Sequence, residues 1–170
     1  MKFLLLILII IPAFSFSQKI TVDKKDEFTK LHVRETSWEK LVEGWHFANY
    51  AMIKQIDDTY YLHIRMMQNN NVFAVDKDAN YMLKAENDSV LTLKNLDYQL
   101  SSRGAGAIGF GGSAGQGIEM TFILGKSDID FLLANKINKI RVYTTKGYLE
   151  ENIKEKNGDN IMHELKLFFP

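Results

Sequence analysis

The chain contains no cysteine, and this absence excludes several kinds of chemistry. Disulfide bonds, thiolate zinc sites, cysteine nucleophiles and a lipid-modified cysteine are all ruled out. If the protein is exported, it gains no stability from an oxidising compartment and must fold on its hydrophobic core alone. Hydrophobic residues make up 46% of the chain, which is enough for a core and too many for a wholly disordered chain.

A net charge of one sign is also missing, because 21 Lys and Arg residues balance 21 Asp and Glu residues. Domains that bind nucleic acid carry a clear positive footprint, so we expect no nucleic-acid partner. Long apolar runs are scarce as well. The nine-residue run Phe3–Ile11 is about half of what a transmembrane helix needs, and we expect no transmembrane segment in the mature chain.

The first residues have the features of a secretory signal peptide. Lys2 supplies a positive charge, and the apolar run Phe3–Ile11 follows it. Ser15 and Ser17 are small residues at positions −3 and −1 of a cut before Gln18. We therefore expect an exported protein that is periplasmic, associated with the outer envelope, or secreted. An uncleaved anchor is the alternative.

The length of 170 residues predicts a single folded domain, since domains usually run to about 100–200 residues. We expect a cleaved signal peptide at 1–17 and a flexible N-terminal arm at 18–27, where the chain is polar and mixed in charge. The remaining residues, 28–170, are expected to form one β-rich domain.

Alternation of apolar and polar residues predicts strands through most of this domain. The expected strands are Phe28–Val33, Tyr60–Met67, 81–85, 91–94, Asp97–Ser102, Ile118–Leu124 and Lys139–Thr144. In the last of these, Ile140 and Val142 should be buried, whereas Lys139 and Arg141 should face solvent. The adjacent Asp57 and Asp58 are typical of a turn.

Helix signals are fewer. Thr36 followed by Glu39 is a capping-box pattern and predicts a short helix at Ser37–Glu43. A second helix is expected after Ser127, and the segment 161–168 has the spacing of either a helix or a strand. The expected fold class is therefore mainly β, an antiparallel β-sandwich or open barrel with two short helices.

The segment Gly104–Gly117 holds seven of the eleven glycines and contains two enzyme-like motifs. Gly104–Gly109 matches G-x-G-x-x-G, and Gly111–Gly115 matches G-x-S-x-G around Ser113. Both motifs need a helix directly after them. Further glycines and a predicted strand follow instead, so we expect neither a dinucleotide site nor a nucleophile elbow, and no cofactor.

Two interpretations of Gly104–Gly117 stay open. The segment is either a flexible connection or an interaction surface, because unstructured loops of this length are uncommon in compact domains unless they are functional or disordered. In the second case, Ile108 and Phe110 are the apolar contacts, and Arg103 and Ser113 are candidate binding residues beside them.

Metal-binding motifs are weak. The histidines lack tight metal-ligand spacing. The run Asp76–Asn80 resembles the start of a calcium loop, but Tyr81 and Asn87 stand where an EF-hand needs glycine and glutamate. A polar turn before a strand explains this run, and we expect no metal.

Two stretches together resemble a group of small exported bacterial proteins that lack an assigned function. The first is Gly104–Gly109 with its continuation through Ser113 to Ile118, and the second is Ile137–Thr144 with Gly147–Glu150 after it. The resemblance implies an exported β-rich domain and carries over no catalytic residue.

The function expected from these observations is a non-enzymatic binding or interaction module of the bacterial cell envelope. Its partner would be a protein or another envelope component. The alternative is a hydrolase-type enzyme whose catalytic residues come from scattered positions around Ser113, with His163 as the base.

Overall fold

The computed structural model describes residues 19–44, 47–68, 71–107 and 115–169. The strands are β1 (Ile20–Lys25), β2 (His32–Thr36), β3 (Glu39–Glu43), β4 (Phe47–Ile56), β5 (Thr59–Gln68), β6 (Ala74–Val75), β7 (Asn80–Ala85), β8 (Val90–Lys94), β9 (Gln99–Leu100), β10 (Ser102–Arg103), β11 (Gln116–Leu124), β12 (Ile137–Thr144) and β13 (Gly147–Asn152). The helices are α1 (Lys126–Ala134), the 3₁₀ turn η1 (Glu155–Asn157) and α2 (Asn160–Lys166).

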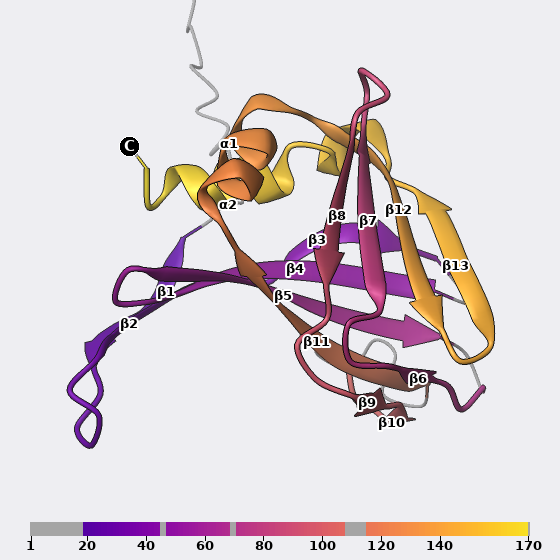
Figure 1. Cartoon of the computed structure of the whole chain (residues 1–170), viewed down its shortest axis with the longest axis horizontal. Helices are drawn as coiled ribbons and strands as arrows, with labels where there is room; N and C mark the ends of the chain where they lie inside the picture. Colours follow the sequence, from indigo (N-terminus) through magenta and orange to yellow (C-terminus); the bar gives the residue numbers. More distant parts are fainter. Residues whose placement is uncertain (1–18, 45–46, 69–70, 108–114, 170) are drawn as a thin grey trace, which may run out of the picture.

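The fold is mainly β, with antiparallel sheets and two α-helices, as the sequence predicts. A seven-stranded sheet has the order β1-β2-β4-β5-β11-β10, with β3 also paired to β4. A four-stranded sheet has the order β13-β12-β7-β8, and β6 and β9 form a separate short pair. The two larger sheets pack face to face and their strands cross steeply (Figure 1), so the arrangement is sandwich-like.

The core lies between the inner faces of these two sheets. Tyr81 on β7 is fully buried, and its ring centroid lies 5.2 Å from that of Phe122 on β11. The Tyr81 hydroxyl donates a hydrogen bond to Oδ1 of Asn49 on β4, at 3.2 Å. This contact satisfies the buried phenol and links the two sheets.

The helices cover the part of the large sheet that the small sheet leaves open, at the top of Figure 1. Ile161 and Leu165 on α2 and Leu132 on α1 are buried in the same core. The segment whose spacing fitted a helix or a strand is therefore a helix. Among the described residues, no helix combines the length and apolar character needed to cross a membrane.

Most of the predicted strands are confirmed. The strands expected at Tyr60–Met67 and Ile118–Leu124 lie within β5 and β11, and Asp57 and Asp58 form the turn before β5. The strand expected at Asp97–Ser102 is instead divided between β9 and β10, which belong to different sheets.

The predicted helix at Ser37–Glu43 is wrong, because this segment contains strand β3. The Thr36 hydroxyl does not cap a helix. It accepts the backbone N–H of Ile53 at 3.0 Å and donates to Glu164 Oε1 at 2.8 Å. Pairing with β4 and burial of Leu41 therefore override the local capping signal.

The N-terminal segment also differs from the expectation. Within the predicted flexible arm at 18–27, Ile20–Lys25 forms β1, which pairs with β2. The Thr21 hydroxyl adds a hydrogen bond to the Thr36 carbonyl at 2.9 Å. Backbone pairing holds this segment, in which the alternation of apolar residues is limited to Ile20 and Val22.

The strand predicted at Phe28–Val33 is displaced by a turn. The Asp26 carboxylate accepts backbone N–H groups from Phe28 and Thr29, at 3.0 and 2.7 Å. Lys30 adopts a left-handed conformation with φ of 62°. Hydrogen bonds to the Asp26 carboxylate thus form the turn at the tip of the β1–β2 hairpin, and β2 begins only at His32.

Candidate functional site

Of the four binding residues predicted from the sequence, only Arg103 is among the described residues. It lies on β10, its side chain is exposed, and its backbone pairs with Gln116. Ile108, Phe110 and Ser113 lie in 108–114, outside the described residues. The interaction surface and the pairing of Ser113 with His163 therefore stay predictions.

The described ends of the glycine segment have a clear structural role. A Cβ atom at Gly117 would lie 1.6 Å from the carbonyl oxygen of Ala105, and one at Gly106 would lie 2.5 Å from that of Met66. Gly106 also has a positive φ of 76°. These glycines let the turn at 104–107 lie directly against β5 and β11.

The three described histidines lie apart from one another. His32 Nε2 is 2.6 Å from Asp23 Oδ1 on β1, and His63 lies on β5 near Glu119. His163 on α2 lines an open, polar hollow together with Lys136 and other charged residues. No group of three or more His, Asp or Glu side chains in the described ranges could hold a metal ion.

On the outer face of the large sheet, basic side chains lie beside carboxylates. Lys54 Nζ is 2.9 Å from Glu35 Oε1, and Arg65 Nε is 2.9 Å from Glu119 Oε2. Hydrogen bonds from His63 and Arg65 lower the pKa of Glu119 to about 2, although partial burial opposes this shift. Lys54 and Arg65 on this face therefore each have a carboxylate partner.

The outer face of the four-stranded sheet has a different balance of positive and negative side chains. Lys84 on β7 lies directly opposite Lys139 on β12, and like charges in such cross-strand pairs are unfavourable. Arg141 follows two residues along β12 and points to the same side. Glu150 on β13 is opposite Arg141 and is a carboxylate shared by more than one cation.

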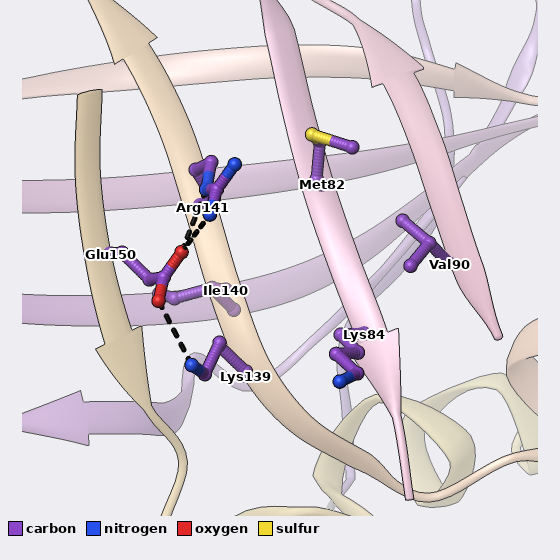
Figure 2. Close-up of a pocket in the computed structure, with 7 residues that line it drawn as sticks. All are labelled: Met82, Lys84, Val90, Lys139, Ile140, Arg141 and Glu150. Carbon is purple, nitrogen blue, oxygen red and sulfur yellow. Dashed lines mark hydrogen bonds and ion pairs between the residues drawn. The ribbon is translucent and has the colours of Figure 1, made fainter. Parts of the chain in front are cut away.

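These side chains surround a shallow hollow of about 140 Å³. We call its outward-facing lining the cationic face, which consists of Met82, Lys84, Val90, Lys139, Arg141 and Glu150. Figure 2 shows these side chains on one side of the sheet, with strands of the large sheet behind them. Met82 and Val90 provide apolar surface between the charges, and Val90 is 46% exposed.

Glu150 is held by both cations of β12. Its Oε1 accepts a hydrogen bond from Lys139 Nζ at 2.9 Å, and its Oε2 accepts from Arg141 Nε at 2.7 Å and from Nη2 of the same guanidinium. These bonds, with Lys139 contributing most, lower the pKa of Glu150 below its ordinary value. Glu150 is therefore ionised at neutral pH.

The carboxylate partner of Lys84 is more exposed to solvent than Glu150. Lys84 Nζ lies 2.6 Å from Asp88 Oδ1 in the turn between β7 and β8, and the Asp88 side chain is 85% exposed. Exposed ion pairs contribute only about 0–1 kcal/mol and weaken with salt. The ammonium group of Lys84 can therefore exchange this partner for another anion at little cost.

Tyrosines continue the surface along β12 and β13. The Arg141 guanidinium carbon lies 4.7 Å from the ring centroid of Tyr148, and the rings of Tyr143 and Tyr148 are 6.1 Å apart. Tyr148 is 59% exposed. The cationic face thus adjoins exposed aromatic rings, which offer an apolar body and a polar hydroxyl to a ligand.

Part of this site could be predicted from the sequence. The alternation along β12 correctly separates buried Ile140 and Val142 from outward-facing Lys139 and Arg141, whose side chains are about one-third exposed. The juxtaposition with β7 and β13 was missed, because strand pairing is not encoded in the local pattern. The alternation of Met82 and Lys84 with buried neighbours was the available signal.

Comparisons with known proteins add no relative. A scan against protein-family models, a search of curated proteins and a search of solved structures each find no match to this chain. The resemblance to small exported bacterial proteins stays an expectation from the sequence.

Proposed function

We propose that the protein is an exported, non-enzymatic binding module of the cell envelope, and that its cationic face binds an anionic polysaccharide. The observation that carries this proposal is the placement of Lys84 directly opposite Lys139 beside Arg141, above an apolar floor. Such an arrangement sacrifices local stability. Local choices that oppose folding are typical of functional sites.

The size of the hollow favours a polymer over an enclosed small molecule. Sites that bury a drug-sized ligand usually measure about 300–1,000 Å³, whereas this hollow measures about 140 Å³. A ligand must therefore lie across the open sheet and place one charged group at a time in the hollow. A chain with repeated negative charges satisfies this geometry.

The neighbouring rings and the expected compartment favour a sugar polymer over a nucleic acid. Exposed Tyr148 can pack its ring against an apolar sugar face while its hydroxyl stays hydrated. An exported protein also meets envelope polysaccharides before it meets DNA or RNA.

Binding to defined polymers tests the proposal. We expect polygalacturonate to bind in low salt and neutral dextran not to bind, as measured by isothermal titration calorimetry. The double variant Lys84→Gln, Lys139→Gln should lower the affinity by about tenfold or more, because charge-assisted contacts are lost. Raising the salt concentration should weaken binding of the wild type more than that of the variant.

The matched control removes two positive charges elsewhere. Lys54→Gln and Lys126→Gln alter the large sheet and α1, where each lysine has its own carboxylate. This double variant should retain most of the affinity. Equal losses in both double variants, or tighter binding to duplex DNA than to polygalacturonate, would count against the proposed site and ligand. Circular dichroism confirms that each variant is folded.

A further inference from the structure

The carboxylate of Glu150 lies at the β13 edge of the cationic face, where it contacts Lys139 and Arg141. It is the one acidic side chain among the residues that line the hollow. Figure 2 shows it reaching from β13 toward β12, with dashed lines to Lys139 and Arg141. We infer that Glu150 is an internal stand-in for the ligand, and that a carboxylate of a uronic-acid polysaccharide replaces it on Arg141 and Lys139. This inference rests on the proposed function.

The geometry of the contacts points to a carboxylate as the anion that the site accepts. One Glu150 oxygen accepts from Nε and Nη2 of Arg141, and the other accepts from Lys139 Nζ. The two donors of Arg141 lie in the plane of the guanidinium. The donors of Arg141 and Lys139 thus engage both oxygens of one carboxylate, and a uronate offers the same group.

The position of Glu150 in the sheet allows it to leave. β13 is an edge strand that pairs only with β12 within the four-stranded sheet, so no neighbouring strand restricts its outer side. The Glu150 side chain is 27% exposed, and those of Lys139 and Arg141 are 36% and 37% exposed. Because these contacts are only partly buried, Glu150 regains hydration when it rotates away.

The free energy of exchanging the Glu150 carboxylate for a ligand carboxylate is close to zero. The affinity must therefore come from contacts that Glu150 does not make. Lys84 lies across from Lys139 and can approach a further anionic group of the polymer. Met82 and Tyr148 offer apolar and aromatic surface beside the exchanged group. Because a ligand must displace the Glu150 carboxylate, the site favours polymers that make several charged contacts over single small anions.

The variant Glu150→Gln tests the inference, because glutamine keeps the size of the side chain and removes its charge. We expect the affinity for polygalacturonate to rise about threefold to fivefold, since the competing anion is gone. Methyl-esterified polygalacturonate, which lacks the carboxylates, should not bind.

The control is Glu119→Gln, which removes a carboxylate from Arg65 on the outer face of the other sheet. It changes the net charge equally and should leave the affinity nearly unchanged. An equal gain in both variants would reveal a bulk charge effect and overturn the inference. A loss of affinity in Glu150→Gln would show that Glu150 positions Arg141 for the ligand, which also overturns it.

The outcomes separate this inference from the proposed function. If the wild type binds polygalacturonate and Lys84→Gln, Lys139→Gln weakens binding, the proposed function stands whatever Glu150→Gln does. If the wild type does not bind and Glu150→Gln does, internal competition is supported. If neither binds, both proposals fail.

Discussion

At the scale of single residues, Glu164 on α2 is a fully buried carboxyl group. The Thr36 hydroxyl donates to its Oε1 at 2.8 Å, and its Oε2 has no hydrogen-bond partner among the described residues. Burial raises the pKa of Glu164 well above its ordinary value of 4.5, and the nearby charge of Glu39 raises it further, whereas the Thr36 hydrogen bond opposes the shift. The folded protein therefore retains a proton that the unfolded chain releases.

This difference makes stability depend on pH in a direction that can be tested. The contribution of Glu164 is fully present below about pH 4.5 and is lost as pH rises toward the folded-state pKa, by up to about 1.4 kcal/mol per pH unit. Glu164→Gln cannot ionise and loses this dependence. We therefore expect the free energy of unfolding of the variant, relative to that of the wild type, to be higher at pH 8 than at pH 4.

Urea unfolding between pH 4 and pH 8 measures this effect. Glu27→Gln is the control, because Glu27 is exposed in the hairpin tip and should leave the pH profile unchanged. Parallel profiles for Glu164→Gln and the wild type would mean that Glu164 does not hold a proton in the folded protein.

At the scale of elements, strand β12 has one face in the core and one in solvent. Val142 is 1% exposed, and its neighbour Arg141 lies on the cationic face. Val142→Asp places an unpaired charge in the core, and we expect it to lower the free energy of unfolding by about 3 kcal/mol or more. Arg141→Gln should cost less than about 1 kcal/mol.

Thermal melting of the two variants checks this prediction. Because the residues are adjacent, a shift of one position in the register of β12 would exchange their faces. Similar losses in melting temperature for both variants would contradict the observed orientation of the strand.

The turn at 104–107 is a second feature at this scale, because its backbone lies against β11. The carbonyl oxygens of Ala105 and Met66 leave no room for a Cβ atom at Gly117. Gly117→Ala must push the backbone of the turn or the strand apart, and we expect a loss of about 2 kcal/mol or more.

Gly44→Ala is the matched control, since its nearest neighbour is the Phe47 carbonyl oxygen at an ordinary 3.7 Å. It should be neutral or slightly stabilising, because alanine restricts the unfolded chain. Chemical unfolding of the two variants provides the comparison. A neutral Gly117→Ala would show that the turn does not pack against the strand.

At the scale of the whole molecule, the predicted signal peptide and the first strand are adjacent in the chain. A cut before Gln18 would leave β1 intact, since that strand begins at Ile20. We expect the protein produced in a Gram-negative host to be recovered from the periplasm or the medium. Its intact mass should correspond to residues 18–170. Recovery of the full-length chain in the membrane fraction would refute cleavage and support the anchor.

The sequence by itself determined those strands, and the helix, in which buried and exposed side chains follow the period of the backbone. In β5, β11 and β12 and in α1, burial follows the local period of the backbone, so the apolar pattern alone identifies each element. The same reasoning identified the strands β7 and β8 and the mainly β fold class.

Only the tertiary structure decided the features that depend on distant pairing. β3 is a strand because β4 offers it backbone partners and because Thr36 bonds to Glu164, 128 residues away. The apolar alternation in β1 is limited to Ile20 and Val22, and the strand is held by β2. The cationic face combines side chains from β7, β12 and β13, and strand order brings them together. Strand order is set by the packing of the whole chain, which no local period records.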